Sequence, residues 1–222
     1  KRGQSVGRGG LDGLGQGALL ICLFGLLRKA DGVTTIADGT ARINSPKAAK
    51  HPDLALAYIP EDRKTEGLVL DQSIQENLEL VALGRADLNA KDATLYQAAL
   101  DQLALKHGGM DLSISSLSGG NQQKVVLAKW LALKPRCLLL ADPTRGIDVK
   151  TKTQIYAMLR QLADQGTAIL LLSTDYEELI QLSDETHVCF DGAIAATLSG
   201  EDLTPQNIIA ATLNVNTRAA HA

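Results

Sequence analysis

The octapeptide at residues 117–124, Leu-Ser-Gly-Gly-Asn-Gln-Gln-Lys, combines residue types that suit phosphate binding. Its two adjacent glycines let the backbone approach a ligand closely, and Ser118 offers a hydroxyl beside them. Apolar residues recur in the next stretch, which predicts a helix over residues 122–133 with one buried side. The hydroxyl and the glycine amides then lie at a helix N-terminus, where unpaired N–H groups and the helix dipole favour an anion. Taken alone, the stretch is equally typical of a Ser-Gly turn that caps an ordinary helix.

A second glycine-rich segment, residues 10–17, precedes an apolar stretch near the start of the chain. Its glycines fit the G-x-x-x-x-G frame of a phosphate loop. Gln16 replaces the Lys that reaches the outer phosphates in such a loop, and Gly17 replaces the Ser or Thr that binds Mg²⁺. Backbone amides can still cradle a phosphate, but losing a charge-assisted contact costs on the order of 1.5–3 kcal/mol. We therefore expect a weak phosphate site, with a plain glycine turn as the alternative, formed by Gly10, Asp12, Gly13, Gly15, Gln16, Gly17 and Ala18.

Arg8 precedes this segment, where a buried strand would enter the loop. An unpaired buried charge is costly. Either Arg8 reaches a phosphate or solvent, or the strand begins later in the chain.

Asp142 follows an apolar run at residues 137–141 and is followed by Pro143. An apolar strand that ends in a carboxylate and a turn is the layout by which nucleotide hydrolases place an acid near Mg²⁺ and the attacking water. A carboxylate in this position can orient water or act as a general base, so Asp142 is the candidate catalytic residue. The alternative is an Asp-Pro pair that only starts a turn.

Short apolar runs alternate with helical patterns along the chain. Buried strands joined by helices predict an α/β fold with a mostly parallel sheet. Residues 73–117 have helical character without a convincing strand, so we expect a single domain over residues 1–222 with a helical subdomain at roughly residues 73–134. The expected strands are residues 33–36, 54–59, 137–141, 168–173 and 186–190, and the expected helices are residues 18–28, 92–105, 122–133, 149–165, 176–182 and 205–213.

Composition excludes several classes of protein. The formal net charge of -3 and the aromatic content of 3% argue against a nucleic-acid partner, which needs basic patches and stacking platforms. The three cysteines are far apart in apolar runs, which favours buried free thiols over a metal site. The longest apolar stretch, residues 17–27, is shorter than the roughly 20 residues that cross a bilayer. The chain lacks an initiator Met and a secretory signal, so we expect an N-terminally truncated piece that is joined upstream to a further domain.

Three strings together resemble a known family: Leu-Ser-Gly-Gly-Asn-Gln-Gln-Lys, the run Leu-Leu-Leu-Ala-Asp-Pro-Thr-Arg-Gly-Ile-Asp-Val at residues 138–149, and Pro-Glu-Asp-Arg-Lys-Thr-Glu-Gly-Leu at residues 60–68. They resemble an ABC transporter ATPase, specifically the C-terminal nucleotide-binding domain of the duplicated ATPase of monosaccharide importers of the ribose, galactose, arabinose and xylose type. The resemblance covers residues 10–212 and implies the P-loop NTPase fold of an ABC ATPase. The first and third strings are far more specific than a glycine loop.

The resemblance assigns roles to particular residues. Two such domains close head to tail, with each ATP between the P-loop of one domain and the signature of the other. Glu61 falls at the Q-loop position, which senses the γ-phosphate, and Asp148 falls at the D-loop position on the dimer seam. The signature that would contact the partner's ATP consists of Leu117, Ser118, Gly119, Gly120, Asn121 and Gln122.

The departures from the family pattern all fall in the domain's own site. Ala141 stands at the position of the Mg²⁺-associated aspartate, and the shorter Asp142 stands at the position of the catalytic glutamate. Thr174 stands at the position of the switch histidine. With Gln16 and Gly17, every Mg²⁺ and hydrolysis position is weakened or absent, so ATP is the expected cofactor and Mg²⁺ is expected to be weakly held.

The resemblance implies a peripheral ATPase on the cytoplasmic face of the inner membrane. Its expected partners are a second nucleotide-binding domain fused upstream, the membrane permease subunits and, indirectly, a periplasmic sugar-binding protein. We expect ATP hydrolysis coupled to monosaccharide uptake, at the site that this signature completes in the partner domain. One alternative is a non-hydrolysing regulatory or structural domain. The other is a cytosolic ABC protein of translation or repair, which the negative net charge disfavours because such a protein would bind nucleic acid.

Overall fold

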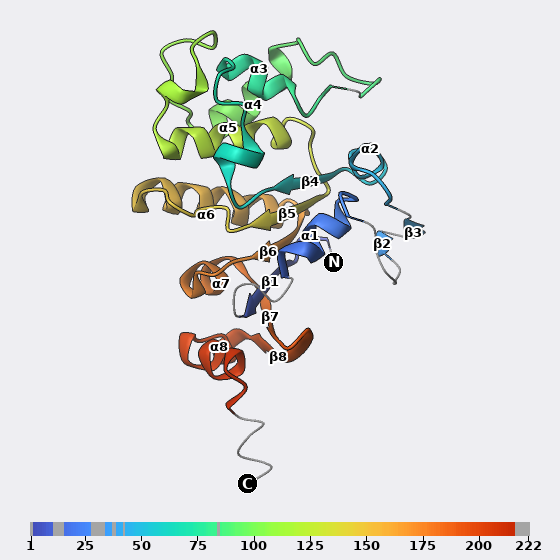
Figure 1. Cartoon of the computed structure of the whole chain (residues 1–222), viewed down its shortest axis with the longest axis vertical. Helices are drawn as coiled ribbons and strands as arrows, with labels where there is room; N and C mark the ends of the chain where they lie inside the picture. Colours follow the sequence, from blue (N-terminus) through green and yellow to red (C-terminus); the bar gives the residue numbers. More distant parts are fainter. Residues whose placement is uncertain are drawn as a thin grey trace.

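A six-stranded sheet runs through the computed structural model of the chain (Figure 1), which describes residues 2–10, 16–27, 34–36, 39–41, 43–83 and 85–215. The strand order is β4-β5-β6-β1-β7-β8, and only the last pair is antiparallel. The carboxyl ends of the five parallel strands therefore meet at one edge. The strands are β1 (Ser5–Gly10), β4 (Leu56–Ile59), β5 (Cys137–Ala141), β6 (Ala168–Leu172), β7 (Glu185–Phe190) and β8 (Ala193–Ser199).

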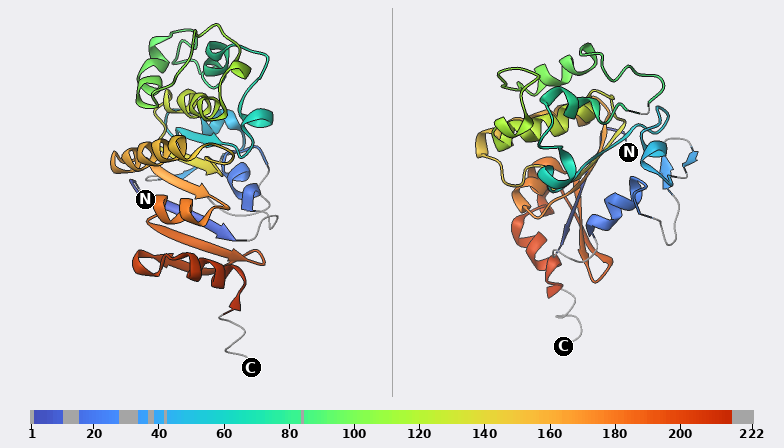
Figure 2. Two further views of the ribbon diagram at one scale, coloured as in Figure 1. Left: turned by 90° about the vertical axis from the view of Figure 1, so that its left-hand side faces the viewer. Right: turned by 45° about the horizontal axis from the view of Figure 1, so that its top comes forward.

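Helices cover both faces of the sheet. Helix α1 (Gln16–Leu23) lies on one face, and α6 (Val149–Asp164), α7 (Tyr176–Leu182) and α8 (Pro205–Thr212) lie on the other (Figure 2, right). Strands β5 and β6 are apolar on both sides, and Leu138, Leu140 and Leu171 are fully buried. This layering confirms the predicted α/β class with a mostly parallel sheet.

The remaining helices gather beyond β4, at the top of Figure 1. They are α3 (Ile74–Glu79), α4 (Thr94–Gln102) and α5 (Gly119–Leu131). Helix α5 is buried from Gln122 to Leu131, because α3 and α4 cover one side and β4 lies against the other. Such a helix connects the helical layer to the sheet, so its N-terminus is held from both directions. None of the described helices is long and apolar enough to cross a membrane.

Some elements differ from expectation. The strand expected at residues 33–36 begins at Thr34 as β2 (Thr34–Ile36), which pairs with β3 (Gly39–Ala41) outside the main sheet. Helix α5 begins at Gly119, three residues earlier than expected, because Ser118 caps it. The unexpected short elements are α2 (Pro46–Ala49), a π-helix (Arg63–Gly67) and two 3₁₀ turns (Ile114–Ser116 and Gly200–Asp202).

Arg8 lies inside β1, not before it. Its backbone is in register with both Leu172 and His187, so the idea that the strand begins later is wrong. Along β1, Ser5, Gly7 and Gly9 are buried and the residues between them are half-buried. The Arg8 side chain is on the half-buried face, which reduces the cost of a charge in a central strand.

Candidate functional site

The first turn of α5 presents the signature residues. Ser118 is its N-cap, and the Ser118 Oγ accepts a hydrogen bond from the Asn121 amide at 3.4 Å. Ser118 is exposed, Gly119 is half-buried and Gly120 is buried. Because Oγ acts as acceptor towards Asn121, the hydroxyl hydrogen remains a donor for a ligand. An exposed hydroxyl beside the first amides of a 13-residue helix fits an anionic group.

Gly120 packs against the start of α6. A Cβ atom on Gly120 would lie 2.8 Å from the Thr151 Oγ1 and 3.2 Å from the Asp148 Oδ2, so only glycine permits this approach. Asp148 caps α6 by accepting from the Thr151 amide at 2.9 Å and from the Thr151 hydroxyl at 2.8 Å. The Thr151 amide hydrogen bond, with the hydroxyl contact, holds the pKa of Asp148 below its usual range. The structure thus brings the expected signature and D-loop residues together.

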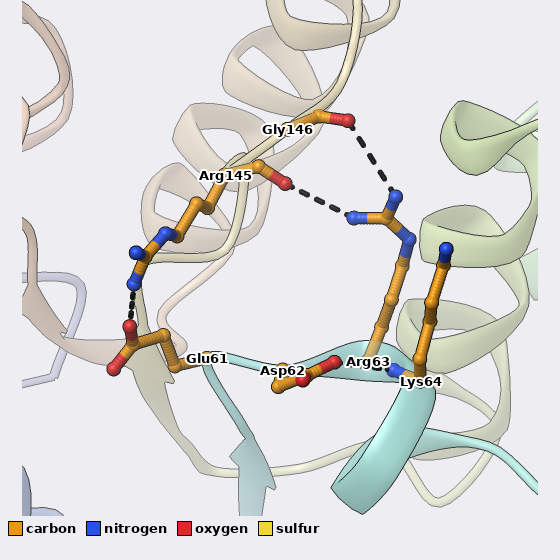
Figure 3. A pocket seen from close by; sticks show the side chains of 6 residues that line it. All are labelled: Glu61, Asp62, Arg63, Lys64, Arg145 and Gly146. Atoms are coloured by element: carbon orange, nitrogen blue, oxygen red, sulfur yellow. Dashed lines mark hydrogen bonds and ion pairs between the residues drawn. The ribbon is translucent and has the colours of Figure 1, made fainter.

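The segment 61–64 lies beside the turn formed by Arg145 and Gly146 (Figure 3). Asp62 caps the π-helix, with its Oδ1 accepting from the Lys64 amide at 2.8 Å, and this hydrogen bond lowers the Asp62 pKa. The Glu61 carboxylate, the expected Q-loop residue, forms an ion pair with Arg145. Arg63 reaches the same turn from the other side, and its Nη1 donates to the Arg145 carbonyl at 3.0 Å. Together these side chains and Gly146 line an open pocket of about 440 Å³.

Asp142 and Thr174 face each other at the carboxyl edge of the sheet. The Asp142 Oδ1 accepts from the Thr174 amide at 2.7 Å and from the Thr174 hydroxyl at 3.0 Å, and the Ser173 Oγ lies 3.3 Å away. Asp142 is buried and has a φ of 41°, a left-handed conformation that is uncommon for Asp. One oxygen of the candidate catalytic carboxylate is therefore committed to the turn that carries the switch position.

Glu178 is a site residue that the sequence interpretation missed. It is 1% exposed on α7, and its two oxygens accept from the Thr144 hydroxyl at 2.6 Å and the Ser173 hydroxyl at 2.5 Å. Burial is the main cause that raises the Glu178 pKa, and the nearby charge of Asp142 adds to it. The sequence does indicate that Glu178 is buried. It precedes the apolar Leu182 by four residues, so the two side chains share one face of the helix.

The expected phosphate loop is described only at its ends. Residues 11–15 lie outside the described residues, as does the side chain of Gln16, so the predictions for Asp12, Gly13 and Gly15 rest on the sequence. Gly10 ends β1 with a φ of 146°, a value that favours glycine. A Cβ on Gly17 would meet nothing within 4 Å, so the first turn of α1, which includes Ala18, is open beside Gly17.

A family model described as "ABC transporter" matches residues 1–145 of the chain. Curated relatives named "Ribose import ATP-binding protein RbsA 1" are similar over almost its whole length. The Mesorhizobium japonicum protein is 47% identical over 221 residues, which is 97% of this chain and 43% of the relative. The Rhizobium etli protein is 49% identical over 219 residues, covering 96% of this chain and 43% of the relative. The chain thus spans less than half the length of these relatives.

Solved structures share the fold at low sequence identity. A nucleotide-free ATP-binding cassette of an ABC transporter has a TM-score of 0.79 and 20% identity, covering 95% of this chain and 85% of the other. A dimeric ATP-binding cassette in a post-hydrolysis state with ADP and phosphate has a TM-score of 0.75 and 21% identity, covering 92% and 87%. Both likenesses support the ABC ATPase fold.

Proposed function

Because the chain belongs to the ABC transporter family, we propose that it is one nucleotide-binding domain of a sugar importer, the C-terminal half of a duplicated ATPase. In this proposal it couples ATP binding and hydrolysis to monosaccharide uptake. The relatives that it matches over 96–97% of its length carry names that describe ribose import. Its partners are the other nucleotide-binding domain, the membrane permease subunits and, through them, a periplasmic sugar-binding protein. The complex works at the cytoplasmic face of the inner membrane.

The observation that carries the proposal is the contrast between two sites in one domain. The signature at the start of α5 is complete and exposed at Ser118. The candidate catalytic Asp142, in contrast, has Oδ1 occupied by two donors of Thr174, its amide and its hydroxyl. A carboxylate fixed in this way is poorly placed to take a proton from water. The signature therefore completes the hydrolysing site of the partner, and the domain's own site binds nucleotide weakly and contributes to closure.

The residues present fit ATP better than they fit Mg²⁺. Ser118, Gly119 and Gly120 would hold a γ-phosphate through the hydroxyl and the first amides of α5. At the domain's own site, amides of Gly17 and Ala18 in the open first turn of α1 would face a phosphate. In such sites Mg²⁺ neutralises charge on the β- and γ-phosphates. Ala141 supplies no carboxylate that could hold this ion at the domain's own site.

Two substitutions in the complete ATPase test this asymmetry. Ser118→Arg places a bulky side chain where the phosphate would lie, and we expect steady-state ATP turnover to fall on the order of a hundredfold, comparable to the loss of a preorganised donor. Asp142→Asn keeps the shape of the side chain, and we expect turnover within about twofold of the wild-type rate. Ser116→Arg, at an exposed serine two residues earlier, is the matched control. If Asp142→Asn abolishes turnover as severely as Ser118→Arg, the asymmetry is wrong.

A regulatory domain that does not hydrolyse ATP is the second candidate, and the committed Oδ1 of Asp142 is the observation in its favour. Under this candidate, the signature serves only dimer contacts. A single-turnover assay with the partner domain present separates the two. Loss of the chemical step in Ser118→Arg supports the importer ATPase, and an unchanged rate supports the regulatory domain.

A further inference from the structure

We propose that Arg63 is a positioning residue for the ATP held by the partner domain, because it fixes the distance between signature Gly119 and the turn at Gly146. This inference rests on the proposed function. Gly119 belongs to the signature, and Gly146 leads into the D-loop residue Asp148. Arg63 comes from a third segment of the sequence. Its guanidinium binds the turn (Figure 3) and lies beside Gly119.

The Arg63 guanidinium spans two consecutive carbonyls. Its Nη1 donates to the Arg145 carbonyl at 3.0 Å and its Nη2 donates to the Gly146 carbonyl at 3.5 Å. A planar guanidinium presents these donors in a fixed fork, which a lysine ammonium cannot reproduce. The contact therefore sets the orientation of the turn as well as its distance.

The same guanidinium occupies the space beside the signature. A Cβ on Gly119 would lie 2.7 Å from the Arg63 Nη2, closer than real side chains approach. Gly119 thus lies beside Arg63, while Gly120 lies beside Thr151 and Asp148. Without Arg63, the Gly119 side of the first turn of α5 would lose this neighbour.

The segment that carries Arg63 is itself anchored. Lys129, which is 5% exposed near the end of α5, donates its ammonium to the Gly67 carbonyl at the end of the π-helix. Asp62 caps the start of this π-helix. Arg63 therefore extends from a support that is fixed at both ends and tied to the signature helix.

The neighbouring ion pair is a weaker candidate for this role. The side chains of Glu61 and Arg145 are 47% and 58% exposed, and solvent-exposed pairs contribute little. Their contact lies on the opposite side of the pocket from the hydrogen bonds of Arg63 (Figure 3). The expected effect of removing this pair is accordingly smaller than that of removing the Arg63 contacts.

The test uses the complete ATPase with Arg63→Met and Arg63→Lys. Methionine keeps the aliphatic stem and removes the donors, so we expect kcat to fall about tenfold or more while the Kd of a fluorescent ATP analogue stays within twofold. Lysine keeps the charge but loses the fork, so we expect it to restore less than half of the wild-type kcat. Amide hydrogen exchange at residues 119–121 should accelerate in both variants. Lys64→Ala is the control, because Lys64 lines the same pocket and no hydrogen bond of its side chain is found among the described residues.

The outcomes separate this inference from the proposed function. If Ser118→Arg abolishes turnover while Arg63→Met stays within twofold of wild type, the positioning role is overturned alone. Full rescue by Arg63→Lys also overturns it, because charge would then be sufficient. If Ser118→Arg is silent, the proposed function fails and the inference fails with it. Thermal melting of each variant, together with normal exchange in the core strands, shows that a loss of kcat is local.

Discussion

Asp142 and Thr174 hold each other where an ABC ATPase would be expected to carry a catalytic glutamate and a switch histidine. The two hydrogen bonds from Thr174 to the Asp142 Oδ1 form a structural link between the ends of β5 and β6. Glu178 continues this link, since it connects Thr144 to Ser173. These side-chain hydrogen bonds connect neighbouring loops at the carboxyl edge of the sheet and make this edge rigid.

Glu178→Gln tests the buried part of this link. The folded-state pKa of Glu178 is raised by burial, so the folded protein binds more protons than the unfolded chain at pH values above about 4.5. The stability that Glu178 contributes is therefore lost as the pH rises from about 4.5 through the raised folded-state pKa. Glutamine does not titrate, so the Glu178→Gln variant does not lose this stability. We therefore expect its free energy of unfolding to increase relative to that of wild type as the pH rises above about 4.5. Urea unfolding at several pH values measures this difference.

Glu177→Gln is the matched control, because Glu177 is an exposed neighbour on the same helix. Its difference from wild type should change little with pH. A Glu178→Gln difference that is equally flat would show that Glu178 ionises in the folded protein as it does in the unfolded chain.

Helix α5 is the element on which both the signature and the fold depend. It lies between the helical layer and the sheet, and Leu127 at its centre is fully buried. Leu127→Ala should lower the free energy of unfolding by about 2–5 kcal/mol, the range for a buried leucine that leaves a cavity. Denaturant unfolding measures the loss. Leu83→Ala, at a side chain that is 55% exposed, should change stability by less than about 0.5 kcal/mol.

The elements with strong local signals were predictable from the sequence. β5 and α7 have the expected bounds, because an apolar run between polar residues and a helical period are both local features. β8 was missed, because this edge strand is mostly exposed and rich in alanine, a residue that is depleted in strands. Arg63 was missed as a link, because its carbonyl partners lie 82 and 83 residues away in the chain and no spacing rule reports them.

In the molecule as a whole, the topology places the carboxyl edge of the sheet and the signature at two separate positions. The ends of β1, β5 and β6 gather at one edge of the sheet, where Asp142 and Thr174 lie. The signature lies at the start of α5, on the side of the helical layer. We propose that the domain serves catalysis through its signature, which would act on a phosphate held by the partner domain.

Trapping of hydrolysed nucleotide tests this asymmetry most directly. The complete ATPase would be incubated with a photoactivatable ATP analogue and vanadate, irradiated, and digested to locate the labelled peptides. We predict vanadate-dependent label on the partner domain's phosphate loop and none on residues 10–17 of this chain. Ser118→Arg should abolish the label on the partner domain. Equal vanadate-dependent labelling of residues 10–17 would contradict it, because this domain's own site would then hydrolyse ATP.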